Sequence, residues 1–222
     1  MDAVEKTDPA YDGQAIYTRG FLAVYDALAY GVNCPIVWRC PKAKVVELYD
    51  DNVTGCHLDV GVATGLLLDE CRFPVPEPEI TLMDLNRNCL DRASRRLSRY
   101  SPRTHQANAL EPWGLPAGTY ESVGVSMLMH CLPGAIPEKS VVFEQARAVL
   151  APGGVMFGAT ILGKGVKQNR LCRHALRTNN RRGVLSNLND SAEDLDTALA
   201  RLFASHQMHV EGAVALFTAH VS

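Results

Sequence analysis

The chain has little net charge, no long apolar run and no closely paired cysteines. Its 222 residues carry 22 basic and 24 acidic side chains, so a formal net charge of −2 gives no overall attraction to nucleic acid or membranes. No run of about 18 consecutive apolar residues occurs, which predicts no segment that crosses a bilayer. The first residues are acidic and polar, unlike a secretory signal. We therefore expect a cytoplasmic protein without a membrane or nucleic-acid partner.

The seven cysteines are widely scattered, at positions 34, 40, 56, 71, 89, 131 and 172. No C-x-x-C pair is present, so the usual zinc-binding spacing is missing and we expect no metal. An odd number of cysteines in a chain of this length also argues against a disulfide framework. We expect reduced thiols in an ordinary globular chain, 47% hydrophobic and 21% charged.

From residue 55 the chain alternates between strand-like and helix-like segments. The predicted strands are 56–60, 79–84, 103–107, 120–128 and 154–161, and the predicted helices are 64–72, 86–99 and 137–150. This order predicts an α/β domain with a parallel sheet and right-handed crossovers. A helix near 191–204 follows, and then two runs, 206–211 and 213–220, predict a closing antiparallel hairpin around Gly212.

The N-terminal part has a different pattern. We expect residues 1–14 to form a loosely attached tail, 15–50 a helical cap and 51–222 the main domain. Apolar residues recur at helical spacing in the cap, and Gly31-Val32-Asn33 is predicted to interrupt the helix. A second helix is expected from near Pro35 to Tyr49.

The segment Cys56–Gly65 is the most informative part of the sequence. A short apolar strand containing Asp59 leads into a small-residue turn, in which Gly61 and Gly65 permit positive φ and close approach of a ligand. A dinucleotide fingerprint would need glycine in place of Ala63 and Leu66, and a P-loop would need lysine after Gly65. Neither pattern is present.

The segment instead resembles motif I of the class I S-adenosylmethionine-dependent methyltransferases, with Ala63 in place of the middle glycine. The resemblance runs from about residue 55 to the C-terminus, and includes the apolar strand before His130 and the Pro-Gly-Gly turn at 152–154. It implies a Rossmann-like α/β fold: a mostly parallel seven-stranded sheet of order 3-2-1-4-5-7-6, flanked by helices, with the N-terminal cap over the cofactor.

The resemblance implies S-adenosylmethionine as cofactor and S-adenosylhomocysteine as product. Asp84 lies 23 residues after Gly61 and matches the residue that binds the ribose hydroxyls; it could instead cap the next helix. Asn108 and Ala109 match the adenine-binding position, where Asn is also a common turn residue. The other implied cofactor residues are Asp59, Gly61, Val62, Ala63, Gly65, Leu85, Ser126 and Met127.

Residues for the acceptor are less well marked. His130 follows the fourth strand and titrates near neutral pH, so it is the candidate general base; it could equally pack at the strand end. Four aromatic residues of the cap could line an acceptor pocket or contact the sulfonium, or could simply form the core of the cap. They are Tyr17, Tyr25, Tyr30 and Trp38.

A basic run without acidic residues extends from Lys164 to Arg182 and contains seven basic side chains. It could recognise an anionic acceptor or form a solvated helix face, partly balanced by the acids from Asp190 onward. The asparagines in 164–190 predict a polar, mobile segment.

The sequence thus predicts a methyltransferase acting on an oxygen, nitrogen or carbon atom of a small molecule, as a monomer or homodimer. Because methyl transfer from a sulfonium is an in-line displacement, alignment of the acceptor matters more than any single residue. Two alternatives remain open: a cofactor-binding protein that catalyses another biosynthetic step, and a non-catalytic partner subunit.

Overall fold

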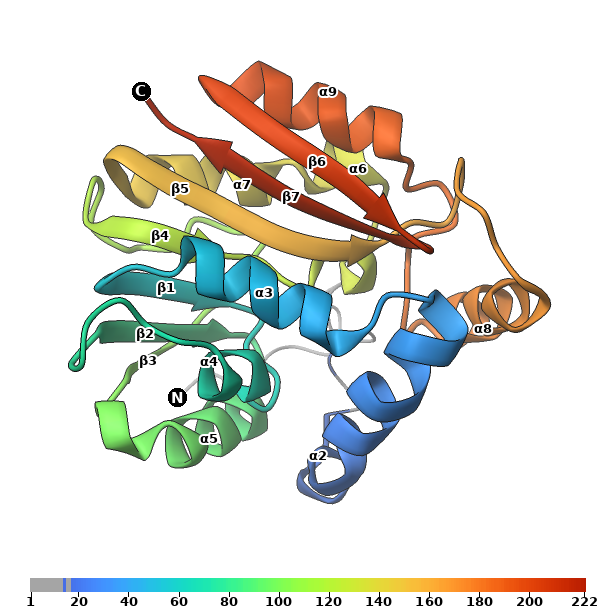
Figure 1. The fold of residues 1–222 in the computed structure, drawn as a ribbon, viewed down its shortest axis with the longest axis horizontal. Coiled ribbons are helices and arrows are strands. Elements are labelled where there is room, and N and C mark those ends of the chain that lie inside the picture. Colours follow the sequence, from blue (N-terminus) through green and yellow to red (C-terminus); the bar gives the residue numbers. More distant parts are fainter. Residues whose placement is uncertain (1–13, 15–16) are drawn as a thin grey trace.

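The computed structural model describes Gln14 and residues 17–222, which form one seven-stranded sheet with helices on both faces (Figure 1). The strand order is β3-β2-β1-β4-β5-β7-β6, as predicted. β1 to β5 are parallel, and β7 is antiparallel to both β5 and β6. The strands are β1 (Cys56–Val60), β2 (Glu79–Asp84), β3 (Arg103–Gln106), β4 (Tyr120–Gly124), β5 (Leu150–Ile161), β6 (Ser205–Glu211) and β7 (Val214–His220).

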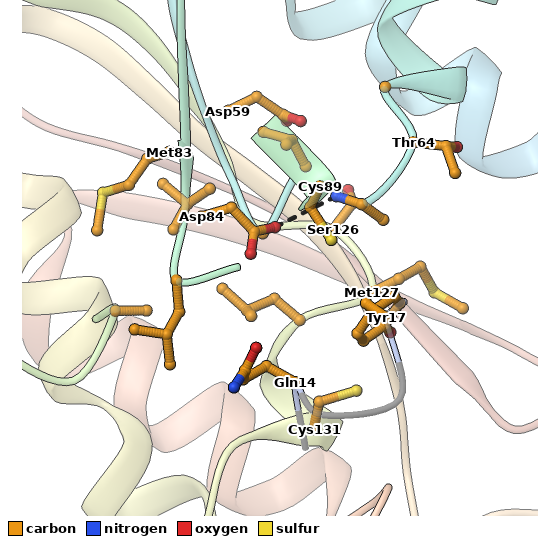
Figure 2. A pocket seen from close by; sticks show the side chains of 18 of the residues that line it. Gln14, Tyr17, Asp59, Thr64, Met83, Asp84, Cys89, Ser126, Met127 and Cys131 are labelled. Atoms are coloured by element: carbon orange, nitrogen blue, oxygen red, sulfur yellow. Dashed lines mark hydrogen bonds between the residues drawn. The ribbon is translucent and has the colours of Figure 1, made fainter. Parts of the chain in front are cut away.

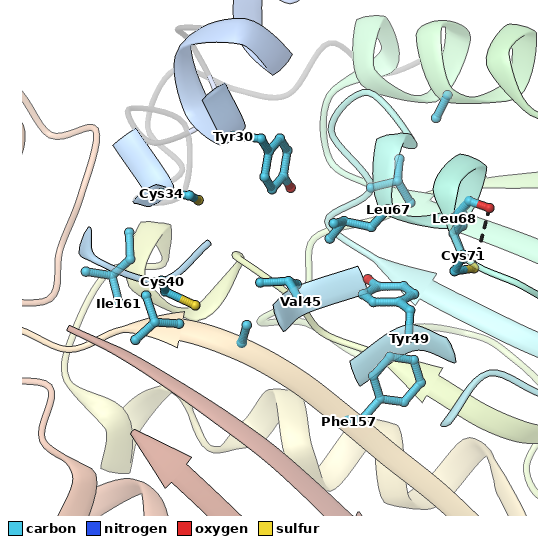
Figure 3. Packing of buried hydrophobic residues seen from close by; sticks show 14 of the residues in the cluster. Tyr30, Cys34, Cys40, Val45, Tyr49, Leu67, Leu68, Cys71, Phe157 and Ile161 are labelled. Carbon is cyan, nitrogen blue, oxygen red and sulfur yellow. Dashed lines mark hydrogen bonds between the residues drawn. The ribbon is translucent and has the colours of Figure 1, made fainter. Parts of the chain in front are cut away.

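A hydrophobic cluster lies on each face of the sheet. The first lies under α3 (Lys42–Asn52), α4 (Leu66–Glu70) and α5 (Arg87–Arg96). The second lies under α6 (Ile136–Lys139), α7 (Val141–Val149) and α9 (Ala192–Leu202). Because helices cover both faces, the central strands are buried along nearly their whole length. Figure 3 shows part of the first cluster, where Tyr49 of α3 lies over Phe157 of β5.

The fourth strand is shorter than predicted. β4 ends at Gly124, whereas the apolar pattern predicted a strand to residue 128. Met127 adopts a φ of 59°, which turns the chain out of the extended conformation. The chain then enters the turn that carries His130.

The N-terminal helices run without the predicted interruption. α2 (Arg19–Asp26) continues into η1 (Ala27–Trp38), a π-helical stretch that includes Gly31-Val32-Asn33 and Pro35 and ends at Arg39, where φ is 58°. The predicted break was therefore wrong, because the wider turns continue the helix through residues that disfavour an α-helix. In Figure 1, α2 projects beyond the edge of the sheet, whereas α3 lies across it. The tail predicted at 1–14 lies outside the described residues, except for Gln14.

The continuous helix Arg19–Trp38 is 20 residues long and has a mean hydropathy of 1.3, which by length and composition is enough to cross a membrane. A search for an uninterrupted apolar run misses it, because Asp26 and Asn33 interrupt the run while the average stays high.

The C-terminal hairpin is tied to the end of this helix. The amide of Ala213 donates a hydrogen bond of 2.8 Å to the carbonyl of Trp38. Gly212, at the turn between β6 and β7, has a φ of 61°, and a Cβ there would collide with the same carbonyl. Only glycine therefore lets the hairpin approach η1 so closely.

The segment after β5 is ordered by buried polar contacts, contrary to the prediction of a mobile region. It contains α8 (Arg170–Arg181) and then a loop in which Asn187 is fully buried and donates to the carbonyl of Ile161 at 2.8 Å. Asp190 is also fully buried and accepts a hydrogen bond of 2.7 Å from Lys139 of α6. Asp190 is thus not a surface counter-charge for the basic run. Burial lowers the pKa of Lys139 and raises that of Asp190, whereas the contact between the two groups opposes both shifts.

Removal of one member of this pair should be costly. We expect Lys139→Ala to lower the free energy of unfolding by about 3 to 5 kcal/mol, because it leaves the Asp190 carboxylate buried without its cation. Urea denaturation measures the loss. The control is Lys139→Met combined with Asp190→Leu, which removes both charges and should cost less; an equal or greater loss would show that packing rather than charge sets the effect.

Candidate cofactor and acceptor site

A deep pocket opens at the carboxyl ends of β1, β2 and β4, where parallel sheets of this type bind their ligands. It encloses about 910 Å³, part of it open to solvent. Figure 2 shows the walls that come from the loop after β1, the end of β2 and the turn after β4. The inner face of α2 and η1 forms a further wall. Every cofactor residue predicted from the sequence lines it: Asp59, Gly61, Val62, Ala63, Gly65, Asp84, Leu85, Asn108, Ala109, Ser126 and Met127.

In the loop after β1, every second residue from Gly61 to Gly65 has a positive φ. Gly61 has a φ of 77°, and a Cβ there would lie 2.9 Å from Cδ1 of Leu128. Gly65 has a φ of 72°, and a Cβ there would lie 3.0 Å from the Cβ of Ala93. Ala63 has a φ of 47°, a conformation that costs an L-residue about 1 to 2 kcal/mol. The loop therefore keeps the backbone shape of a three-glycine loop although only two glycines are present.

Substitution of Ala63 by glycine tests whether the positive φ at this position is strained. Ala63→Gly should raise the free energy of unfolding by about 0.5 to 1 kcal/mol, since relief of the positive φ exceeds the entropy that glycine adds to the unfolded chain. Thermal denaturation without cofactor measures it. In the control, Ala117→Gly, the residue is exposed and its φ is not positive, so stability should fall slightly. A loss for Ala63→Gly would mean that the loop is not strained there.

Asp84, at the end of β2, is held in place by the neighbouring backbone. Its Oδ1 accepts from the amide of Asn86 at 2.8 Å, and its Oδ2 accepts from the amide of Ala63 at 3.4 Å (Figure 2). The α5 helix is capped by Asn86, whose side chain accepts from the amide of Asn88. The carboxylate of Asp84 is therefore left to face the pocket. Burial raises its pKa to about 6.

Asp59 lies deeper in the pocket and is fixed by a helix distant from the loop. The hydroxyl of Tyr49 donates to its Oδ1 at 2.8 Å. Across the sheet, Gly124 leaves room for this carboxylate, because a Cβ there would lie 2.5 Å from the same oxygen. The buried hydroxyl of Ser126 has no hydrogen-bond partner among the described residues. These polar groups meet a pocket rather than a filled core, which suits a polar ligand.

Asn108 keeps both readings that the sequence left open. It lines the pocket, and its Oδ1 also accepts from the amide of Leu110 at 3.0 Å, as in a turn. Sequence reasoning missed other lining residues altogether, among them Gln14, Tyr49, Cys89 and Cys131. Tyr49 falls at the end of a helix within the predicted cap, but no local motif marked its side chain as a lining residue.

Three of the four predicted acceptor aromatics reach the pocket, namely Tyr17, Tyr25 and Tyr30. The ring centroids of Tyr17 and Tyr25 are 5.5 Å apart, and those of Tyr25 and Tyr30 are 6.2 Å apart with edge-to-face packing. Burial raises the pKa of all three phenols. Trp38 does not line the pocket, because it is buried in the core beside the C-terminal hairpin.

His130 does not line the pocket either. Its side chain is buried, and its Nδ1 accepts from the amide of Ile161 at 3.3 Å. Burial lowers its pKa to about 3, so the ring is neutral and faces β5. The geometry therefore corrects the assignment of His130 as general base, since a base must reach the proton it removes. Its place after the fourth strand could not show which way the ring points.

Comparison with known proteins identifies the family. A model described as a methyltransferase domain matches residues 58–156. The chain is 43% identical over 208 residues to demethylluteothin O-methyltransferase from Streptomyces thioluteus, covering 94% of this chain and 90% of that protein. This chain belongs to the class I S-adenosylmethionine-dependent methyltransferases.

Two further comparisons agree with this. The methyltransferase is 36% identical over 223 residues to the physcion biosynthesis cluster O-methyltransferase of Aspergillus chevalieri, covering 96% of this chain and 97% of that one. The solved structure of the DhpI-SAH complex superposes with a TM-score of 0.66, covering 94% of this chain and 95% of that chain at 16% identity. At that identity the likeness shows the fold alone. The enzyme uses S-adenosylmethionine as its cofactor and transfers methyl groups to small molecules.

The raised pKa of Asp84 predicts a pH-dependent cofactor affinity. If Asp84 binds the ribose hydroxyls as the sequence predicts, its protonation in the free enzyme below about pH 6 removes acceptor capacity, and the affinity for S-adenosylhomocysteine should fall by up to about tenfold per pH unit. Calorimetric titration from pH 7.5 down to about 5 tests this. Asp84→Asn should bind more weakly at neutral pH and show a flat profile.

The stability of the ligand-free protein should depend on pH in the opposite direction to the cofactor affinity. Because the folded-state pKa lies above the unfolded value, Asp84 contributes stability below about pH 4 that is lost as the pH rises through 6. A wild-type affinity that stays constant between pH 5 and 7 would remove Asp84 from the ribose role.

Proposed function

We propose that this methyltransferase transfers the methyl group of S-adenosylmethionine to an acidic hydroxyl, phenolic or enolic, of an apolar small molecule. The observation that carries the proposal is the composition of the pocket, in which three tyrosines form a wall and no histidine or lysine occurs among the described lining residues. The names of the two relatives, both O-methyltransferases, support transfer to oxygen.

In this proposal the cofactor lies along the carboxyl ends of the strands. Asp84 accepts the ribose hydroxyls, Asn108 and Ala109 contact the adenine, and the loop Gly61–Gly65 follows the backbone of the ligand closely. Asp59 and Ser126 face the amino-acid portion, where a carboxylate and a free hydroxyl suit an ammonium and a carboxylate. The bound cofactor supplies an electrophilic methyl group on a sulfonium.

Four ionisable side chains of the pocket, a phenol, a thiol and two carboxylates, are poorly suited to remove the proton of the acceptor hydroxyl. Burial raises the pKa of Tyr25 far above neutrality and that of the Cys131 thiol to about 12, so neither group is ionised near neutral pH and neither can act as an anionic base. The carboxylates of Asp59 and Asp84 have other partners. An acceptor whose hydroxyl already ionises near neutral pH avoids this difficulty. The protein then aligns the oxygen with the methyl group and excludes water.

We further propose a cytoplasmic enzyme that acts without nucleic acid, as a monomer or homodimer. The net charge of −2 supports the absence of a nucleic-acid partner. The basic run on α8 lies outside the lining of the pocket, which argues against its contact with an anionic group of the acceptor.

Transfer of labelled methyl to a panel of acceptors tests the reaction. We expect turnover with phenols and enols, and a rate that rises with pH to a plateau whose midpoint follows the pKa of each acceptor. Aliphatic alcohols and amines of the same shape should react far more slowly. A midpoint that stays fixed while the acceptor pKa varies would show that an enzyme group takes the proton, and cofactor binding without any methyl transfer would favour a different biosynthetic step.

The tyrosine wall can be tested at one position. Tyr25→Ala should raise the acceptor KM by roughly tenfold or more, since a large buried ring is lost from the pocket. Tyr25→Phe keeps the ring and should retain kcat and KM within about twofold, because removal of one hydroxyl has a small effect when it is not the base. A large loss of kcat in Tyr25→Phe would instead place its hydroxyl in the chemistry.

A further inference from the structure

The outer face of the N-terminal helix is apolar along its whole length. Between Arg19 and Arg39, every exposed residue is glycine, alanine, valine, leucine, isoleucine or proline. Its four large apolar side chains recur every fourth residue and are between 44% and 56% exposed: Val24, Leu28, Val32 and Ile36. An apolar face this long, presented to solvent, marks an interaction surface.

Helix α8 extends this face at its C-terminal end. It packs beside η1, and the side chain of Asn169, the N-cap of α8, donates a hydrogen bond to the carbonyl of Ile36 at 3.4 Å. Leu171, in the next turn, is 57% exposed. It stands between Arg170 and Arg173, which are both exposed as well.

Basic residues outnumber acids in the two segments that carry the apolar face. Asp26 is the only acid between residues 17 and 46, and it is bound by Arg96 at 2.6 Å and by Thr64 at 2.5 Å. The range 164–189 contains no acid and seven basic residues. The chain is nearly neutral overall, so this cationic rim is a local feature.

We propose that this apolar face, Val24, Leu28, Val32, Ile36 and Leu171, docks on the surface of an anionic lipid bilayer. An apolar helix face bordered by basic side chains suits the interface between acyl chains and anionic head groups. A second copy of the chain fits less well, because pairing of the two faces would bring two cationic rims together.

The helix lies on the bilayer and does not cross it. Its inner face carries Tyr25 and Tyr30, which line the cofactor pocket, and Asp26, whose ion pair with Arg96 joins α2 to α5. Insertion across a membrane would break these contacts and bury a charge in hydrocarbon. One helix therefore presents one face to the bilayer and the other to the site, so an apolar acceptor dissolved in lipid would lie close to the pocket.

Co-sedimentation with lipid vesicles tests the proposal with the full chain, without cofactor or acceptor, so that its outcome is independent of the proposed reaction. The probes are vesicles of phosphatidylcholine alone and of phosphatidylcholine with phosphatidylglycerol in equal parts. We expect binding to the anionic vesicles, weaker binding to the neutral ones, and release by high salt. Absence of binding to the anionic vesicles would overturn the proposal.

Two sets of variants separate the apolar and the charged contributions. Leu28→Ser combined with Val32→Ser, and separately Arg170→Glu combined with Arg173→Glu, should each weaken vesicle binding by about tenfold or more. The matched controls are Val75→Ser, an exposed apolar residue in the loop before β2, and Arg147→Glu, an exposed residue of α7; both should bind as the wild type does. Equal losses in the controls would contradict the proposed face.

Sedimentation velocity tests whether a second copy of the chain, rather than a bilayer, covers the apolar face. We expect the oligomeric state of the wild type to be unchanged by Leu28→Ser with Val32→Ser. A dimer that these substitutions convert to a monomer would overturn the proposal and assign the face to a second copy. Retention of S-adenosylhomocysteine binding by the variant confirms that its fold and pocket are intact.

Discussion

The hydrogen bond from the hydroxyl of Tyr49 to Asp59 fixes the floor of the pocket, and much of the central structure is arranged around it. It joins α3, which lies across the sheet, to β1 at its centre. Neighbouring elements leave space for the pair: β4 has Gly124 beside the carboxylate, where a Cβ would lie 2.5 Å from Oδ1. Below it, His57 stacks on Phe157 with ring centroids 5.7 Å apart. A buried carboxyl group needs hydrogen-bond partners that the fold provides, so the position of α3 and the glycine at residue 124 both serve one buried side chain.

Backbone strain is concentrated on the two walls of the same pocket. Ala63 in the loop after β1 and Met127 in the turn after β4 both have positive φ without being glycine. Such conformations persist where the surrounding structure determines them, and they gather at functional sites. At Ala63 the strained turn aims its amide at Asp84, so the carboxylate and the loop hold each other in position. Two walls of the pocket are thus held in conformations that the surrounding structure imposes.

The sequence predicted those parts of the structure that repeat at short range. The strand ranges 56–60 and 79–84 agree with the structure, because apolar runs and turn residues are local signals. The sheet order, which the family resemblance implied, also agrees. The loop motif likewise located Asp84. Side-chain direction is not a local signal, and this is why His130 and Trp38 were assigned to a site that they do not reach. Polar composition was also misleading: Asp190 looked like a surface residue because its partner, Lys139, is 51 positions away. Tyr49 was missed for the same reason, since only the folded chain brings α3 beneath β1.

The contact between Trp38 and the β6–β7 turn joins a segment that is synthesised early to one that is synthesised late. The turn approaches the carbonyl of Trp38 through Gly212 and Ala213, and β7 lies inside the sheet, between β5 and β6. During synthesis, the helix that lines the pocket, residues 19–38, leaves the ribosome early, and the turn at residues 212–213 that supports it follows much later. Until β7 has inserted, η1 has no partner for its final carbonyl, and its apolar outer face belongs to a nascent chain whose core is still open. The contact that fastens the end of this helix is therefore made by a segment synthesised late, after every described residue that lines the pocket.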